Sequence, residues 1–98
     1  MATFAVTYDY ATDSDQVRDA HRPEHVAFLR GLHEEGALYM SGPLAQDPPR
    51  ALLIFEAPDA DALAARLDAD PFHRVGAIGV RTITPWNVFF DPRAAVVA

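Results

Sequence analysis

His25 lies at a position where a helix would bury it, and its ring is the first candidate for chemistry in this chain. At about 100° per residue of a helix, Phe28, Leu29 and Leu32 fall within about 60° of His25. Burying a polar ring without a hydrogen-bond partner is costly, so His25 needs one. The carboxylate of Asp70, which is followed by a proline, is the expected partner. An imidazole held by a carboxylate can transfer protons near neutral pH, as a general acid or base does.

Both residues also have ordinary structural interpretations. A lone histidine on an apolar helix face is commonly a core residue whose polar atoms are satisfied inside the protein. An aspartate before a proline is a common N-cap and first-turn pair, so Asp70 could simply begin a helical turn. A metal held by His25, Asp70 and a third group is a further alternative. However, no zinc motif is present, and we expect neither a metal nor another cofactor.

Three further residues are candidates for contacting a ligand. Arg22, one turn before His25, could bind a carboxylate or an enolate, or it could be a solvated arginine at a helix start. Ser41 could donate a hydrogen bond to a ligand oxygen, although such serines commonly satisfy local backbone groups. No Gly-x-Ser-x-Gly pattern surrounds Ser41, so we do not expect a nucleophile there. Trp86 could line the same pocket, although a single tryptophan more often packs in a core.

Composition narrows the class of protein. The 98 residues predict one domain over residues 1–98, and 50% of them are hydrophobic, as in a folded chain. A net charge of −6 without a basic run argues against binding nucleic acid. All 8 basic residues are arginine, which excludes Schiff-base chemistry on a lysine. The sequence has no cysteine, no signal-peptide pattern and no apolar run near the roughly 20 residues that span a membrane. We therefore expect a cytoplasmic protein without a membrane partner.

The pattern of residues predicts elements in the order β-α-β-β-α-β. We expect strands over residues 3–8, 37–41, 50–57 and 80–90, and helices over residues 23–35 and 58–67. Pro23 is expected in the first turn of the main helix and Gly36 at its end. A further short turn is expected from Asp70 to Gly76. This order predicts an α+β, ferredoxin-like domain, in which both helices cover one face of an antiparallel sheet.

The last predicted strand is apolar on both of its sides. Trp86 and Phe90 share one side, and Ile83 and Phe89 share the other. Neither face of the sheet should then be open to water, so we expect a face-to-face homodimer, with a well-packed monomer as the alternative. Pro85 interrupts the hydrogen bonding of this strand, which predicts a sheet edge or a bulge.

The order and spacing of several short motifs resemble those of the YCII-related family. The motifs are Arg22-x-x-His25-x-x-x-Leu29, Glu35-Gly36, Ser41-Gly42-Pro43, Asp68-Ala69-Asp70-Pro71-Phe72 and Pro85-Trp86. The resemblance extends from Phe4 to about Phe90. It implies a ferredoxin-like domain that pairs into dimers, with a histidine–aspartate pair that maps onto His25 and Asp70. The family includes a few enzymes that eliminate chloride from, or isomerise, products of aromatic degradation, and many members without an assigned reaction.

Together, the residues and the resemblance predict a small isomerase or lyase, dehydrochlorinase-like, that acts on a small acidic organic substrate. In this hypothesis His25 is the base and Asp70 orients it, while Arg22, Ser41 and Trp86 contact the anionic ligand. A non-catalytic module that binds a small ligand or serves as a partner subunit is the alternative. A purely structural pair, with no ligand at all, is the third hypothesis.

Overall fold

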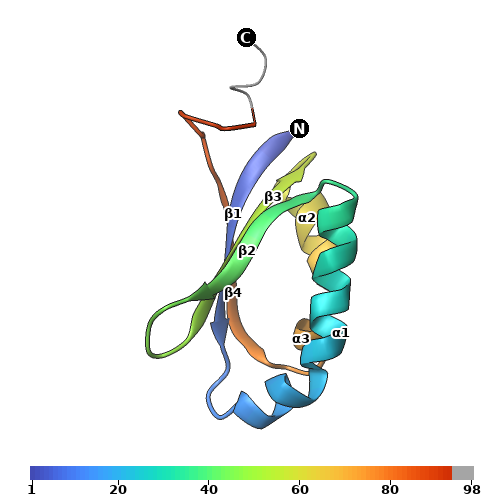
Figure 1. Ribbon diagram of the computed structural model, residues 1–98, viewed down its shortest axis with the longest axis vertical. Helices are drawn as coiled ribbons and strands as arrows, with labels where there is room; N and C mark the ends of the chain where they lie inside the picture. Colours follow the sequence, from blue (N-terminus) through green and yellow to red (C-terminus); the bar gives the residue numbers. More distant parts are fainter. Residues whose placement is uncertain (94–98) are drawn as a thin grey trace.

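Four antiparallel strands form a sheet, and three helices cover one of its faces (Figure 1). The computed structural model describes residues 1–93. The elements follow one another as β1 (Ala2–Tyr10), α1 (Asp15–Glu34), β2 (Leu38–Leu44), β3 (Arg50–Ala57), α2 (Ala60–Leu67), α3 (Pro71–Arg74) and β4 (Ile78–Pro85). The order of strands across the sheet is β2-β3-β1-β4. The predicted ferredoxin-like architecture is confirmed.

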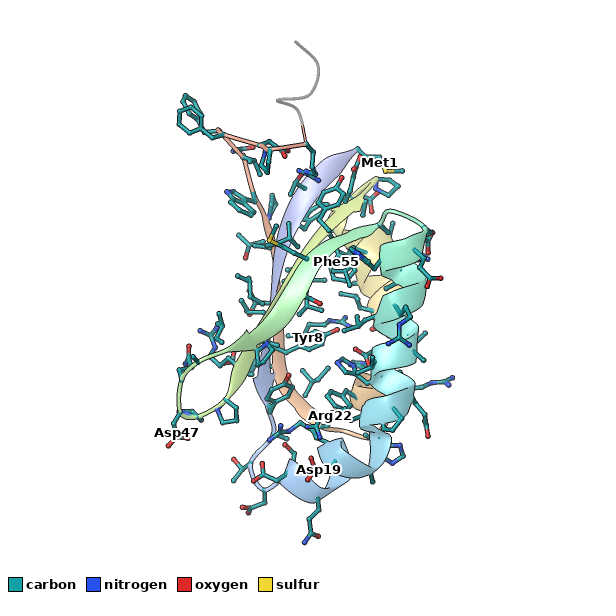
Figure 2. The ribbon with its side chains drawn as sticks, in the orientation of Figure 1. Met1, Tyr8, Asp19, Arg22, Asp47 and Phe55 are labelled. Carbon is teal, nitrogen blue, oxygen red and sulfur yellow. The ribbon has the colours of Figure 1, made fainter. Side chains whose placement is uncertain are left out.

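The core lies between the sheet and the helices. Successive side chains of a strand face opposite sides, so alternate residues of β1 and β3 point toward the helices. Phe4 pairs with Phe55 and Val6 with Leu53 across the two strands, and all four side chains are buried. Figure 2 shows Tyr8 and Phe55 in this layer. Three leucines from α1 and α2 complete the core from the helix side: Leu32, Leu63 and Leu67.

The main helix begins at Asp15, well before the start at Pro23 that the sequence predicts. Pro23 therefore lies inside α1 and not in its first turn. A proline inside a helix lacks one N–H donor and crowds the preceding turn, which bends the helix without necessarily ending it. Figure 1 shows the first turns of α1 at an angle to the rest of the helix. This bent first segment carries Arg18 and Arg22.

The end of α1 lies where Gly36 predicts it. Gly36 has a φ of 88°, in the left-handed region that a glycine adopts without strain. Its N–H donates to the carbonyl of His33 at 3.1 Å, and the N–H of Ala37 donates to the carbonyl of Leu32 at 3.0 Å. These two bonds are the Schellman arrangement, which satisfies the last carbonyls of a helix and turns the chain. The chain thereby enters β2 alongside the helix.

Both edge strands differ in length from the prediction. β2 continues through Gly42 and Pro43 to Leu44, because a proline costs little on an edge strand where its missing donor is not needed. β4 ends at Pro85 and not at Phe90. Pro85 lies on an edge strand, as expected. Among the described residues, no helix has the length and apolarity needed to cross a membrane.

Candidate active site

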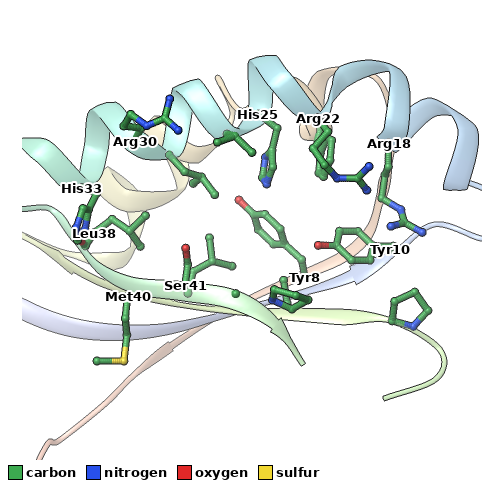
Figure 3. Close-up of a pocket in the computed structure, with 18 residues that line it drawn as sticks. Tyr8, Tyr10, Arg18, Arg22, His25, Arg30, His33, Leu38, Met40 and Ser41 are labelled. Atoms are coloured by element: carbon green, nitrogen blue, oxygen red, sulfur yellow. The ribbon is translucent and has the colours of Figure 1, made fainter. Parts of the chain in front are cut away.

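A cavity of about 760 Å³ lies between α1 and the sheet (Figure 3). Its walls come from α1, the strands β1, β2 and β3, the loop before β3, and Phe72 of α3. His25 extends from α1 into this space, opposite Tyr8 of β1. None of the 18 described residues that line it is acidic, although the chain has 14 acidic residues. Its size is that of a site for a small organic molecule.

His25 and Asp70 form the hydrogen-bonded pair that the sequence predicts. Nδ1 of His25 lies 2.8 Å from Oδ1 of Asp70. The Asp70 side chain is fully buried, and the His25 side chain is only 12% exposed. An ionised carboxylate can only accept hydrogen bonds, so in the neutral ring Nδ1 carries the proton and Nε2 keeps a lone pair. The pair therefore holds the imidazole in the tautomer that can accept a proton at Nε2.

Three donors converge on the carboxylate of Asp70. Oδ1 accepts from His25 and from the backbone N–H of Phe72 at 2.9 Å, and Oδ2 accepts from the hydroxyl of Tyr8 at 3.1 Å. These bonds offset the cost of burying a charge. Asp70 is thus both the N-cap of α3 and the partner of His25, so the two interpretations of this residue hold together. Within residues 1–93, no three His, Cys, Asp or Glu side chains gather as a metal ion would require.

Phe72 fixes the plane of the imidazole. The two rings are stacked, with centroids 3.8 Å apart and an angle of 2° between their planes. Phe72 is buried two residues after the cap, in the short helix that Asp70 begins. One turn of the chain therefore supplies both the carboxylate that orients His25 and the ring that supports it.

Two tyrosines of β1 add hydroxyl groups to the cavity. The pKa of Tyr8 is raised well above its ordinary value, first by burial and then by the charge of Asp70 and the hydrogen bond to it. Tyr8 therefore remains a hydrogen-bond donor at neutral pH. Burial also raises the pKa of Tyr10, and the nearby charges of Arg18 and Arg22 oppose that shift.

The structure brings together most of the predicted site residues, with one exception. Arg22 of α1 and Ser41 of β2 line the same cavity as His25. Trp86 does not line it, and its side chain is 46% exposed. The reason is topological, since Trp86 follows β4 at one edge of the sheet, whereas the cavity lies over β1, β3 and the opposite edge strand β2.

Five polar residues of the cavity were not predicted as ligand contacts: Tyr8, Tyr10, Arg18, Arg30 and His33. Strand periodicity could have found the tyrosines, because Tyr8 and Tyr10 continue the period of two that begins with the buried Phe4 and Val6 of β1. Arg18 was missed because the helix was predicted to begin after it. His33 was predicted as an ordinary boundary residue, and its Nδ1 lies 2.8 Å from the carbonyl oxygen of Leu38.

Fold and site together define a small ferredoxin-like α/β domain with a buried histidine–aspartate pair beside a ligand-sized cavity. Residues 1–87 match the model of the YCII-related domain. The chain is also 33% identical over 87 residues to the protein YciI of Escherichia coli O6:H1, a match that covers 80% of this chain and 89% of that protein. The chain belongs to the YCII-related family.

Solved structures share this fold. One is the 5-chloro-2-hydroxyhydroquinone dehydrochlorinase of Burkholderia phenoliruptrix AC1100 in complex with 2,5-dihydroxybenzoquinone. It has a TM-score of 0.76 and 23% identity, over 89% of this chain and 95% of that chain. Another is an antibiotic biosynthesis monooxygenase, with a TM-score of 0.56 and 14% identity, over 92% of this chain and 100% of that chain. At these sequence identities, the similarity to the two solved structures shows a shared fold alone.

Proposed function

We propose that the protein is an isomerase or lyase that acts on a small organic acid, with His25 as the general base and Asp70 as its orienting partner. The observation that carries this proposal is the 2.8 Å bond that joins His25, at the wall of the cavity, to the fully buried carboxylate of Asp70. Acid–base help of this kind typically contributes about 10²–10⁴-fold to a rate.

In the proposed reaction, Nε2 of His25 removes a proton from a carbon of the substrate, and the C–H electron pair remains on the substrate. Return of the proton at a second position completes an isomerisation. Departure of chloride or hydroxide with its own electron pair, as the new double bond forms, completes an elimination. In both cases the imidazolium that forms is stabilised by the charge of Asp70.

Arg22 and Ser41 are proposed to hold the substrate. The guanidinium of Arg22 at the cavity wall would bind an acidic group of the substrate, and the hydroxyl of Ser41 would donate to a substrate oxygen. The dehydrochlorinase of the same fold, solved with 2,5-dihydroxybenzoquinone, supports elimination on a small oxygenated substrate. The absence of acidic residues from the cavity wall supports a ligand of negative charge.

The test is a screen of small carboxylates and chlorinated ring-cleavage products with the wild type and His25→Gln, followed by NMR of substrate and product. Turnover by the wild type should fall at least about 100-fold in His25→Gln. Glu24→Gln, on the exposed neighbour, is the matched control and should turn over normally. Equal turnover in His25→Gln would remove His25 from the mechanism. A ligand that raises the melting temperature without forming any product would instead indicate a binding module.

We also propose a homodimer that forms through the sheet face turned away from the helices. The register pairs Met40 with Ile54 and Val80 with Asp9, which places these residues on that face. Met40 is 63% exposed and Val80 is 57% exposed in the single chain. A second copy would cover this apolar surface.

The lack of cysteine supports a reducing compartment, and we propose the cytoplasm.

A further inference from the structure

Positive charge gathers at the end of the cavity where α1 begins. The guanidinium carbon of Arg18 lies 4.3 Å from the centroid of the Tyr10 ring. Figure 3 shows the guanidinium of Arg22 directed toward the same end, and all three residues line the cavity. In a chain of net charge −6, this end of the cavity is therefore an electropositive exception.

The two arginines keep donors that their local contacts do not use. Arg18 donates to Ser14 and Asp15, and Arg22 donates to Asp19. Each guanidinium has five N–H donors, so some remain in both cases. The Arg18 side chain is only 11% exposed, whereas the carboxylate of its partner Asp15 is 87% exposed. Arg18 is thus a nearly buried cation whose acidic partner lies in water.

We propose that Arg18, Arg22 and Tyr10 form an anion-binding subsite, which selects substrates by an acidic group held away from the reacting carbon. The proposal rests on the proposed function in one respect, because His25 marks the position of that carbon. Along α1, Arg22 lies about one turn before His25 and Arg18 about two turns before it. An anion bound between the two arginines would therefore lie on the side of His25 toward the start of α1.

Apolar side chains define the rest of the ligand. The apolar part of the cavity wall includes Val26, Leu29 and Leu53. A ligand with an apolar part that packs against these side chains gains affinity through the hydrophobic effect, whereas a fully polar ligand would not. The subsite and the wall together fit a small organic acid that carries its carboxylate or phenolate at one end of an apolar, ring-sized body.

Benzoate and its neutral analogue benzamide test the subsite by calorimetric titration of the full chain. Benzoate should bind at least about tenfold more tightly than benzamide, since a charge-assisted bond to a shielded guanidinium is stronger than a neutral one. Arg18→Gln should weaken benzoate about tenfold or more and leave benzamide unchanged. Arg74→Gln removes the same charge from α3, outside the cavity, and should leave both affinities unchanged.

Arg18 also contacts the first turn of α1, so a second variant separates recognition from folding. Arg18→Lys keeps the charge and should recover part of the benzoate affinity, with circular dichroism to verify the helix. Equal affinities for benzoate and benzamide, an unchanged benzoate affinity in Arg18→Gln, or no saturable binding of benzoate would each overturn the subsite. The proposed function can fail separately from the subsite. Normal turnover in His25→Gln would show that His25 is not the base, whereas Arg18→Gln would still weaken the binding of benzoate.

Discussion

The hydroxyl of Tyr8 donates to Oδ2 of Asp70 at 3.1 Å, across 62 positions of the chain. Both side chains are fully buried. Tyr8 lies on a central strand of the sheet, and Asp70 begins the short helix α3. The same carboxylate also binds His25 of α1, so it joins the sheet and two helices at one point.

Tyr8 should make the protein lose stability in alkaline solution. Its pKa is raised in the folded state, so the unfolded chain releases this proton more readily as pH rises above the ordinary value of 10.0. The contribution of Tyr8 is therefore fully present below about pH 10 and is lost progressively above it. The free energy of unfolding, measured in urea at increasing pH, should decline less steeply for Tyr8→Phe than for the wild type. Equal slopes would contradict this prediction.

Asp70→Ala should be strongly destabilising, by about 3–5 kcal/mol. The substitution leaves three donors without an acceptor, on the buried Tyr8 and Phe72 and on the largely buried His25. Asp59→Ala is the matched control, because Asp59 caps α2 through one exposed bond and should cost only about 1 kcal/mol. The measurement is the free energy of unfolding in urea. If both variants cost the same, Asp70 is only a helix cap.

Asp70 should also determine which nitrogen of His25 carries the proton. In the wild type, ¹⁵N NMR at alkaline pH should show Nδ1 protonated and Nε2 unprotonated. In Asp70→Asn, the amide can donate to Nδ1 as well as accept from it, so the population of the second tautomer should rise. His33 provides an internal control, because its Nδ1 faces the carbonyl of Leu38, which the substitution does not change. An unchanged tautomer ratio for His25 would show that Asp70 does not orient the ring.

Local patterns were sufficient for much of the fold. The strand over residues 50–57 has the bounds that its apolar run predicts, and the left-handed turn at Gly36 ends α1 as expected. Pro23 misled the prediction because a proline fits both the first turn of a helix and a bent interior. The residues around it do not distinguish the two cases, and packing of the bent segment against the rest of the domain decides between them.

The candidate site was predictable only in part. Helix periodicity requires a partner for His25, and the Asp-Pro pair identified one. The contact between Tyr8 and Asp70 depends on sheet register and on the docking of α3, which no short-range pattern encodes. Trp86 was misplaced for the same reason, because strand order puts it at the edge of the sheet away from the cavity.

The proposed dimer predicts that a charge on the open sheet face separates the two copies. Val80→Glu introduces a carboxylate at a position that is 57% exposed in the single chain. Burying that unpaired charge between two copies would be costly, so light scattering should show a dimer for the wild type and a monomer for the variant. Ala27→Glu adds the same charge to the outside of α1 and should remain dimeric. A monomeric wild type would contradict the proposal.

The double role of Asp70 affects how related sequences should be interpreted. Because the carboxylate begins a helix and satisfies Tyr8 whether or not any ligand is turned over, selection for folding alone would retain it. His25 caps nothing, and it lines the cavity. In a relative with this fold, an aspartate at this position is therefore informative about stability, whereas a histidine opposite it is the better marker of retained chemistry.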